Sequence, residues 1–272
     1  MSAPLAVARI LARAALCVLG ALGTAAIAGA GDDRESTDDP PMVLLELFTS
    51  EGCSSCPPAD RLLEDLSGGE LAKGVEIVPL SFHVDYWNHL GWRDPYSRAE
   101  FSRRQESYAA VLSSDVFTPQ LVVDGEAQLV GSDRREALAA IGRAAKRPRA
   151  SVEMARINDP QAPPRKAAWK VAIDASSLVQ RPALTYLFVA VTEDGLASSV
   201  ARGENAGRTL RHVGVVRALR PLGRLWLDED GKATRDVTLD LDPSWQVDRL
   251  HVVAWLADGP NGRVVGSVRN RY

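Results

Sequence analysis

The sequence predicts an α/β domain with a helical insertion, followed by an all-β, sandwich-like C-terminal domain. Three observations support this prediction. The chain has 272 residues, which is more than one compact domain usually contains. Residues 42–147 alternate between strand and helix patterns, interrupted at about 83–115 by a polar and aromatic insertion. Residues 150–272 instead hold short β-rich runs separated by turn residues, with hardly any helical periodicity.

The N-terminus predicts export. Residues 1–30 are typical of a signal peptide, because Arg9 and Arg13 are their only charges and an Ala-rich apolar run leads to small residues that fit Ala-x-Ala cleavage. An uncleaved anchor is the alternative, although the run is short for a membrane span. Residues 31–41 are acidic and predict a flexible lead-in. We therefore expect a periplasmic or secreted bacterial protein with no stable membrane span after signal cleavage.

The charge and the cysteine content narrow the function. The formal net charge of −3 gives no reason to expect nucleic acid as a partner. Cys17 lies within the signal peptide, so the mature chain would contain only Cys53 and Cys56. This local pair closes almost no loop, and as a disulfide it would restrain the unfolded chain little. A chemical role is therefore favoured over a structural one.

The first elements of the α/β domain surround these cysteines. Residues 42–49 and 75–82 are largely apolar and predict two buried strands. Between them, Pro57 and Pro58 open a helix whose leucines have helical spacing. The order strand, Cys-Ser-Ser-Cys, helix, strand is typical of a βαβ unit with parallel strands. It places the two cysteines at the start of a helix.

A Cys-x-x-Cys pair at a helix start suits thiol–disulfide exchange. The unpaired N–H groups and the helix dipole favour thiolate over thiol. Cys53 would be the attacking thiolate and Cys56 the resolving thiol, with a mixed disulfide to the partner as the intermediate. Two alternatives stay open. One is a metal-binding or delivery module, for example for copper, in which a histidine such as His83 supplements the sulfurs. The other is an interaction protein whose C-terminal domain binds a partner and whose disulfide is permanently closed and structural.

Glu46 is a further candidate for the site. It shares a strand face with Leu44 and Phe48 if the alternation holds. A buried acid beneath the dithiol could relay the proton that Cys56 loses during exchange. The alternative is an edge-strand residue whose carboxylate reaches water.

Thr118 and Pro119 precede a strand predicted at 120–123, which pairs with 128–130 in a hairpin before a helix that Asp133 caps. A cis Thr118–Pro119 bond would turn the Thr118 backbone toward the dithiol. A trans proline that merely begins an edge strand is the alternative, and the residues alone favour it.

The insertion contains one predicted helix, at 98–112. Its aromatic residues Tyr86, Trp87 and Trp92 are expected to pack it onto the core, and a lid over the active site is the alternative. His83 is expected to be a hydrogen-bonded residue at a strand end; alternatively, it lowers the pKa of a thiol.

The β-rich segment offers two minor candidates. Residues 203–208 predict a turn, with an anion site built around Arg208 as the alternative. Arg211 and His212 follow on a strand and predict a solvated face.

Residues 42–147 resemble the thioredoxin superfamily, because a strand, a Cys-x-x-Cys helix start and a later Thr-Pro before a hairpin follow one another in that order. The resemblance implies a thioredoxin-like fold and a cis Pro119 beside Cys53 and Cys56. It also implies a buried acid near the position of Glu46, although one extra residue precedes the first cysteine here.

The sequence is more specifically similar to a family of secreted bacterial proteins called domain of unknown function 1223. The similar stretches are 46–60, 83–87, 104–105 with Tyr108, 118–120, 204–208 and 215–217. The resemblance implies a fold and assigns no activity. We therefore expect an exported thiol–disulfide oxidoreductase that acts on protein or small-molecule thiols and disulfides and needs no cofactor.

Overall fold

The computed structural model describes residues 40–158, 160, 161, 163 and 165–272, which belong to one compact unit. The predicted signal peptide and all but the last two residues of the predicted lead-in lie outside the described residues. Within the described ranges, no helix is long and apolar enough to cross a membrane.

The expected βαβ unit is present. It consists of β1 (Met42–Thr49), α1 (Pro57–Ser67) and β2 (Glu76–His83), and the two strands pair in parallel with Met42 opposite Glu76. Both strands are almost wholly buried, which is why their sequences are nearly continuous apolar runs.

The predicted hairpin and its flanking helices follow. In chain order these elements are η1 (Asn88–Leu90), α2 (Ala99–Leu112), β3 (Gln120–Val123), β4 (Ala127–Val130) and α3 (Arg134–Ala144). α3 begins where predicted because the carboxylate of Asp133 accepts the N–H of Glu136 at 2.9 Å, as an N-cap does.

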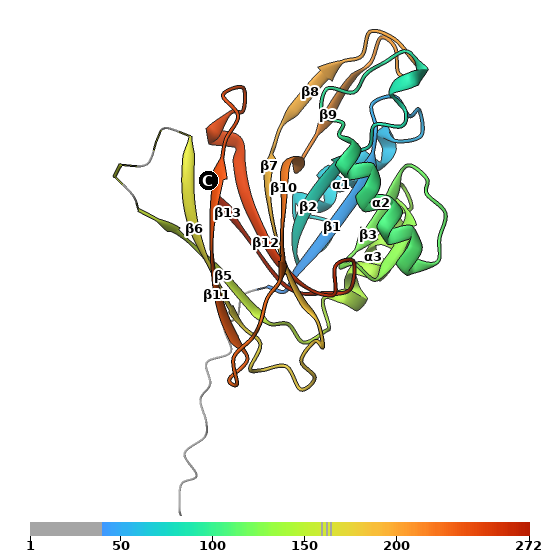
Figure 1. The fold of residues 1–272 in the computed structure, drawn as a ribbon. Coiled ribbons are helices and arrows are strands. Elements are labelled where there is room, and N and C mark those ends of the chain that lie inside the picture. Colours follow the sequence, from blue (N-terminus) through green and yellow to red (C-terminus); the bar gives the residue numbers. More distant parts are fainter. Residues whose placement is uncertain (1–39, 159, 162, 164) are drawn as a thin grey trace, which may run out of the picture. The chain divides into compact units, whose positions relative to one another are not determined.

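The second half of the chain is β-rich, as predicted. Its elements are β5 (Ser151–Ile157), β6 (Lys166–Asp174), β7 (Thr185–Glu193), β8 (Leu196–Ser199), β9 (Thr209–His212), β10 (Val215–Arg224), β11 (Lys232–Asp240), η2 (Val247–Arg249), β12 (Leu250–Asp258) and β13 (Val264–Arg271). β8 and β9 form a ribbon of their own that extends beyond the main sheet, beside the segment that follows β2 (Figure 1).

The expected fold class, an α/β thioredoxin-like domain with a helical insertion followed by an all-β sandwich-like domain, is wrong. The described chain is mainly β, and one eight-stranded mixed sheet runs through both halves in the order β13-β12-β7-β10-β2-β1-β3-β4. β10 joins β2 in parallel where Val215 lies opposite Ser81, and the N–H of Ser81 donates to the carbonyl of Gly214 at 2.8 Å. The change of periodicity near Pro148 therefore does not divide the sheet.

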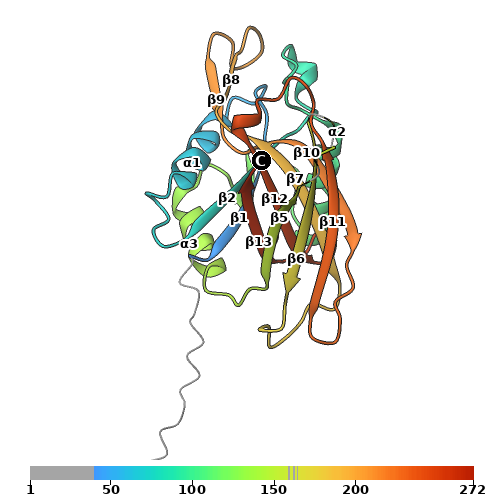
Figure 2. The ribbon, with the colours of Figure 1, turned by 90° about the vertical axis from the view of Figure 1, so that its left-hand side faces the viewer.

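The sheet carries different layers on its two faces. α1 and α3 pack against the face of β1 that presents Val43, Leu45 and Leu47, whereas α2 packs against the face with Leu44 and Phe48. In Figure 2, α1 and α3 lie on one side of β1 and α2 lies on the other. A second, three-stranded sheet (β11-β6-β5) packs against β7 and β12. A residue's place along β1 thus decides whether it faces α1, with the cysteines, or α2.

Candidate active site at the Cys53–Cys56 disulfide

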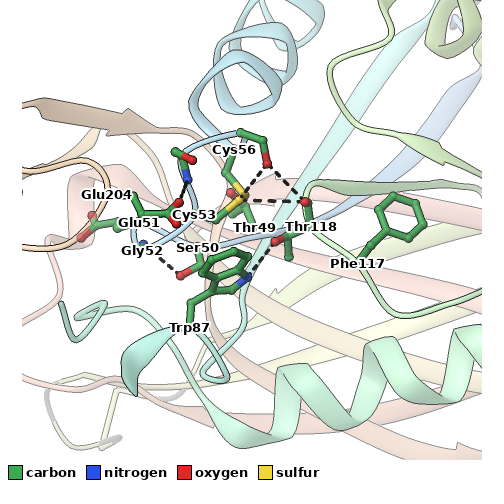
Figure 3. Close-up of a disulfide and its surroundings, with 12 residues drawn as sticks. Thr49, Ser50, Glu51, Gly52, Cys53, Cys56, Trp87, Phe117, Thr118 and Glu204 are labelled. Carbon is green, nitrogen blue, oxygen red and sulfur yellow. Dashed lines mark hydrogen bonds between the residues drawn. A yellow bond between two sulfur atoms is a disulfide. The ribbon is translucent and has the colours of Figure 1, made fainter. Parts of the chain in front are cut away.

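Cys53 and Cys56 form a disulfide at the N-terminus of α1 (Figure 3). Cys56 is the N-cap residue, and Pro57 and Pro58 occupy the first two helical positions, where a missing N–H removes no helical bond. Both cysteines are 0% exposed, while Ser54 and Ser55 between them are exposed. The two serines therefore form the outer surface of the Cys-x-x-Cys loop and the disulfide lies beneath them.

Thr118 and Pro119 lie beside the disulfide, and the bond between them is cis. The carbonyl oxygen of Thr118 lies 3.9 Å from Sγ of Cys53 and accepts the hydroxyl of Ser55 at 3.4 Å. Trp87 fixes the other side of this residue, since its indole N–H donates to Oγ1 of Thr118 at 2.8 Å. The structure thus brings Cys53, Cys56, Thr118 and Pro119 together, as predicted.

Glu46 does not lie beneath the disulfide, and it does not reach water either. It is on the α2 face of β1, where Arg104 donates to both carboxylate oxygens at 2.5 and 3.0 Å and the hydroxyl of Tyr108 donates at 2.5 Å. The Arg104 guanidinium also lies 5.0–5.6 Å from the centres of four aromatic rings. Predicting a proton relay through Glu46 was wrong, because the sheet separates its carboxylate from α1.

Residues 203–208 hold the Cys-x-x-Cys loop from the C-terminal half of the chain. The fully buried amide of Asn205 donates to the carbonyls of Glu51 and Cys53, at 2.9 Å each. The carboxylate of Glu204 accepts the exposed N–H of Ser54 at 2.9 Å, and hydrogen bonding from Ser54 lowers the pKa of Glu204. Arg208 donates to Oδ1 of Asn205 at 3.1 Å and so orients this amide.

A cluster of buried ionisable side chains lies behind the loop. It comprises Glu51, Asp60, His83, Asp94 and His212, all at most 5% exposed. The rings of the two histidines meet edge to face with their centres 4.7 Å apart. We refer to these five residues as the buried ionisable cluster.

One half of the buried ionisable cluster is the pair His83–Asp94. Nδ1 of His83 lies 2.7 Å from Asp94, whose carboxylate also accepts the backbone N–H groups of Glu51 and Tyr96. Burial opposes both charges, but the ion pair outweighs it: Asp94 raises the pKa of His83, and His83 lowers the pKa of Asp94. The expectation of a hydrogen-bonded strand-end histidine at His83 is confirmed.

The other half links His212 to the loop and to α1. Nε2 of His212 lies 3.2 Å from the carboxylate of Glu51, which also accepts the indole N–H of Trp92 at 2.8 Å. Nδ1 of His212 lies 3.9 Å from Asp60. The expectation of a solvated face at His212 was wrong. Its neighbours come from segments more than 100 residues upstream, and the strand pattern of β9 carries no signal of them.

The metal alternative finds no support in the geometry. Among the described residues, no group of three or more histidine, cysteine, aspartate or glutamate side chains is arranged to hold a metal ion. The triplet of Cys53, Cys56 and His83 is therefore not brought together as a ligand set.

Comparisons with known proteins place the chain in a family without assigning it a function. No curated protein matches. A crystal structure of a protein from Agrobacterium tumefaciens is similar over 84% of this chain and 92% of that one, with 26% identity and a TM-score of 0.62. HBP35 of Porphyromonas gingivalis is similar over 85% and 75%, respectively, with 16% identity and a TM-score of 0.65, which indicates the fold alone. The pattern of a family described as "protein of unknown function" (DUF1223) matches residues 44–257, and the chain belongs to that family.

Proposed function

We propose that this protein is an exported thiol–disulfide oxidoreductase that works through Cys53 and Cys56. The observation that carries the proposal is the position of the pair, which lies at the N-terminus of α1 beside Thr118, with Cys56 as the N-cap residue. In the reduced state, the positive end of the helix dipole favours a thiolate at Cys53. The presence of a disulfide fits an oxidising compartment, which agrees with the export that the N-terminal sequence predicts.

The exchange would proceed in two displacements. The Cys53 thiolate attacks one sulfur of a partner disulfide, forms a mixed disulfide and expels the partner's other sulfur as a thiolate. Cys56, once deprotonated, attacks Sγ of Cys53, closes the Cys53–Cys56 disulfide and expels the second partner thiolate. Two electrons pass from the dithiol to the partner, and the reverse sequence would oxidise a partner dithiol.

Access to the sulfurs requires a local movement. Because both cysteines are 0% exposed and the hydroxyl of Ser55 lies 3.2 Å from Sγ of Cys53, a partner would reach this sulfur after Ser55 moves away. Partners with small or unfolded thiol-bearing segments would need the smallest opening. Protein or small-molecule thiols and disulfides are therefore the proposed substrates.

The test is exchange with glutathione and reduction of insulin disulfides by the mature chain. Wild type should react, and Cys53→Ser should abolish the reaction. Cys56→Ser should instead accumulate a mixed disulfide at Cys53, because the resolving thiol is missing. Equal activity in wild type and Cys53→Ser would disprove the proposal.

A second candidate is a structural disulfide that only holds the loop in shape. It is favoured by the complete burial of the pair and by the two hydrogen bonds from Asn205. The reduction potential separates the candidates: a value well below about −300 mV is typical of structural disulfides, and higher values are typical of catalytic ones.

A further inference from the structure

Asp60 lies one helical turn after Cys56. Its N–H donates to the carbonyl of Cys56 at 3.1 Å, so the two residues belong to the same turn of α1. Residues four apart share a helix face with Cβ atoms about 5–6 Å apart, and helical side chains lean toward the N-terminus. The side chains of Asp60 and Cys56 therefore lie on the same face of α1, and both residues are buried.

His212 is positioned to accept a proton from Asp60. When Glu51 is ionised, Nε2 of His212 donates to it, because a carboxylate only accepts. In the neutral ring Nδ1 then carries the lone pair, and it lies 3.9 Å from Oδ2 of Asp60. Within the described part of the chain this buried nitrogen has no hydrogen-bond partner. The other oxygen, Oδ1, accepts the hydroxyl of Thr49 at 2.9 Å, which fixes the carboxyl.

The charges around Asp60 suit a proton acceptor. The ionisable groups that face it are His212 on β9, His83 at the end of β2 and Asp94 before α2. Burial raises the pKa of Asp60, and the two histidines partly oppose that rise. The shift brings the carboxyl closer to the pKa of a thiol, which makes proton transfer between them more efficient.

A groove connects Asp60 to solvent. It lies between α1 and β9, has a volume of about 150 Å3 and is lined by Asp60 together with Pro57, Arg61, Glu64, Thr209, Leu210 and Arg211. This volume accommodates water molecules. A proton that reaches Asp60 can therefore leave on the side of α1 away from the Cys-x-x-Cys loop.

We propose that Asp60 accepts the proton of Cys56 during resolution of the mixed disulfide, shares it with Nδ1 of His212, and releases it to solvent through the α1–β9 groove. The inference rests on the proposed function. In this step the Cys56 S–H bond breaks, its proton moves to the Asp60 carboxylate, and the thiolate attacks Sγ of Cys53. One disulfide forms, the mixed disulfide breaks, and the partner leaves as a thiolate.

The experiment uses the reduced mature chain and the aromatic disulfide dithiobis(nitrobenzoate). This reagent releases one coloured thiolate when Cys53 attacks it, and a second when Cys56 resolves the mixed disulfide at Cys53. In Asp60→Asn, which keeps an acceptor for Thr49, the first release should keep its wild-type rate. The second release should slow about 100-fold or more near pH 6. The difference should shrink toward pH 9, where Cys56 ionises without help.

Matched variants complete the test. Asp65→Asn removes an exposed acid of the same helix and should leave both releases unchanged, whereas Asp60→Glu should restore much of the second. An Asp60→Asn defect that is equal at every pH, or an unchanged second release, would overturn the inference.

Failure of the proposed function is recognised separately, as the absence of the first release in wild type. If Asp60→Asn does not fold, His212→Gln takes its place. The amide of Gln can still donate to Glu51, and this variant should slow the second release with the same pH dependence. An unchanged second release in His212→Gln would then refute the relay.

Discussion

Asn205→Ala should loosen the Cys-x-x-Cys loop and speed its reduction. The substitution removes the hydrogen bonds to the carbonyls of Glu51 and Cys53, which are buried beneath residues 203–208. The carbonyl of Cys53 still accepts the backbone N–H of Cys56 at 3.2 Å. Losing the hydrogen bond at Cys53 therefore costs less than losing the one at Glu51. Leaving a buried acceptor unpaired costs about 1–3 kcal/mol, and losing an ordinary hydrogen bond about 1 kcal/mol. We therefore expect the free energy of unfolding to fall by about 2–4 kcal/mol.

The same loss favours the opened state through which a thiol reaches the disulfide. If the substitution lowers the free energy of loop opening by about 2 kcal/mol, the population of the opened state rises roughly 30-fold, because each 1.36 kcal/mol is a factor of ten. Urea unfolding measures the first quantity, and the rate of disulfide reduction by a small thiol measures the second.

Asn270→Ala is the control for this prediction. Its amide donates to the carbonyl of Met154 at 2.7 Å, so it removes a comparable hydrogen bond away from the cysteines. It should lower the free energy of unfolding and leave the reduction rate nearly unchanged. The reasoning is refuted if Asn205→Ala lowers stability while reduction keeps its wild-type rate, since the disulfide would then be reached without releasing the loop from Asn205.

Three further predictions concern stability. Arg104→Met should lower the free energy of unfolding in urea by about 3–5 kcal/mol, because it leaves Glu46 buried without its cation; a loss below about 1 kcal/mol would contradict this. The His83–Asp94 pair should stabilise most between about pH 4 and 6.5. Stability is lost as the pH falls through the lowered pKa of Asp94, because the carboxylate is then protonated. Stability is also lost as the pH rises through the raised pKa of His83, because the imidazolium then loses its proton. The difference in unfolding free energy between wild type and Asp94→Asn should therefore decrease on both sides of this window, and a difference independent of pH would refute the pairing. Gly214→Ala should destabilise by more than about 1 kcal/mol, because φ is +59° and an added Cβ would overlap the backbone of β2; a wild-type thermal midpoint would argue against it.

Local elements could be predicted because their signals lie within the element. The apolar run of β1, the prolines that open α1 and the Asp133 N-cap each belong to one short stretch of sequence. The same holds for Cys53 and Cys56, since the short segment between β1 and α1 carries both.

Long-range pairing could not be predicted in the same way. β7, β10 and β12 are β-rich runs whose periodicity does not indicate which strands they pair with. The pairing of β10 with β2, which brings β7 and β12 into the same sheet, was therefore not predicted. Glu46 was placed on the correct face of β1, but its partner Arg104 is 58 residues away. His212 approaches Glu51 across 161 residues, and a single sequence gives no sign of that contact.

The continuity of the sheet across β2 and β10 has a consequence for the order in which the chain folds. The Cys-x-x-Cys loop is translated early, but Asn205 and His212, which complete its surroundings, emerge about 150 residues later. A high average sequence separation between contacting residues slows folding. The two cysteines would therefore remain open to oxidants and to other chains until β8–β10 arrive. A fragment ending near residue 147 would leave the β2 edge unpaired and prone to aggregation, so it is not a minimal version of the site.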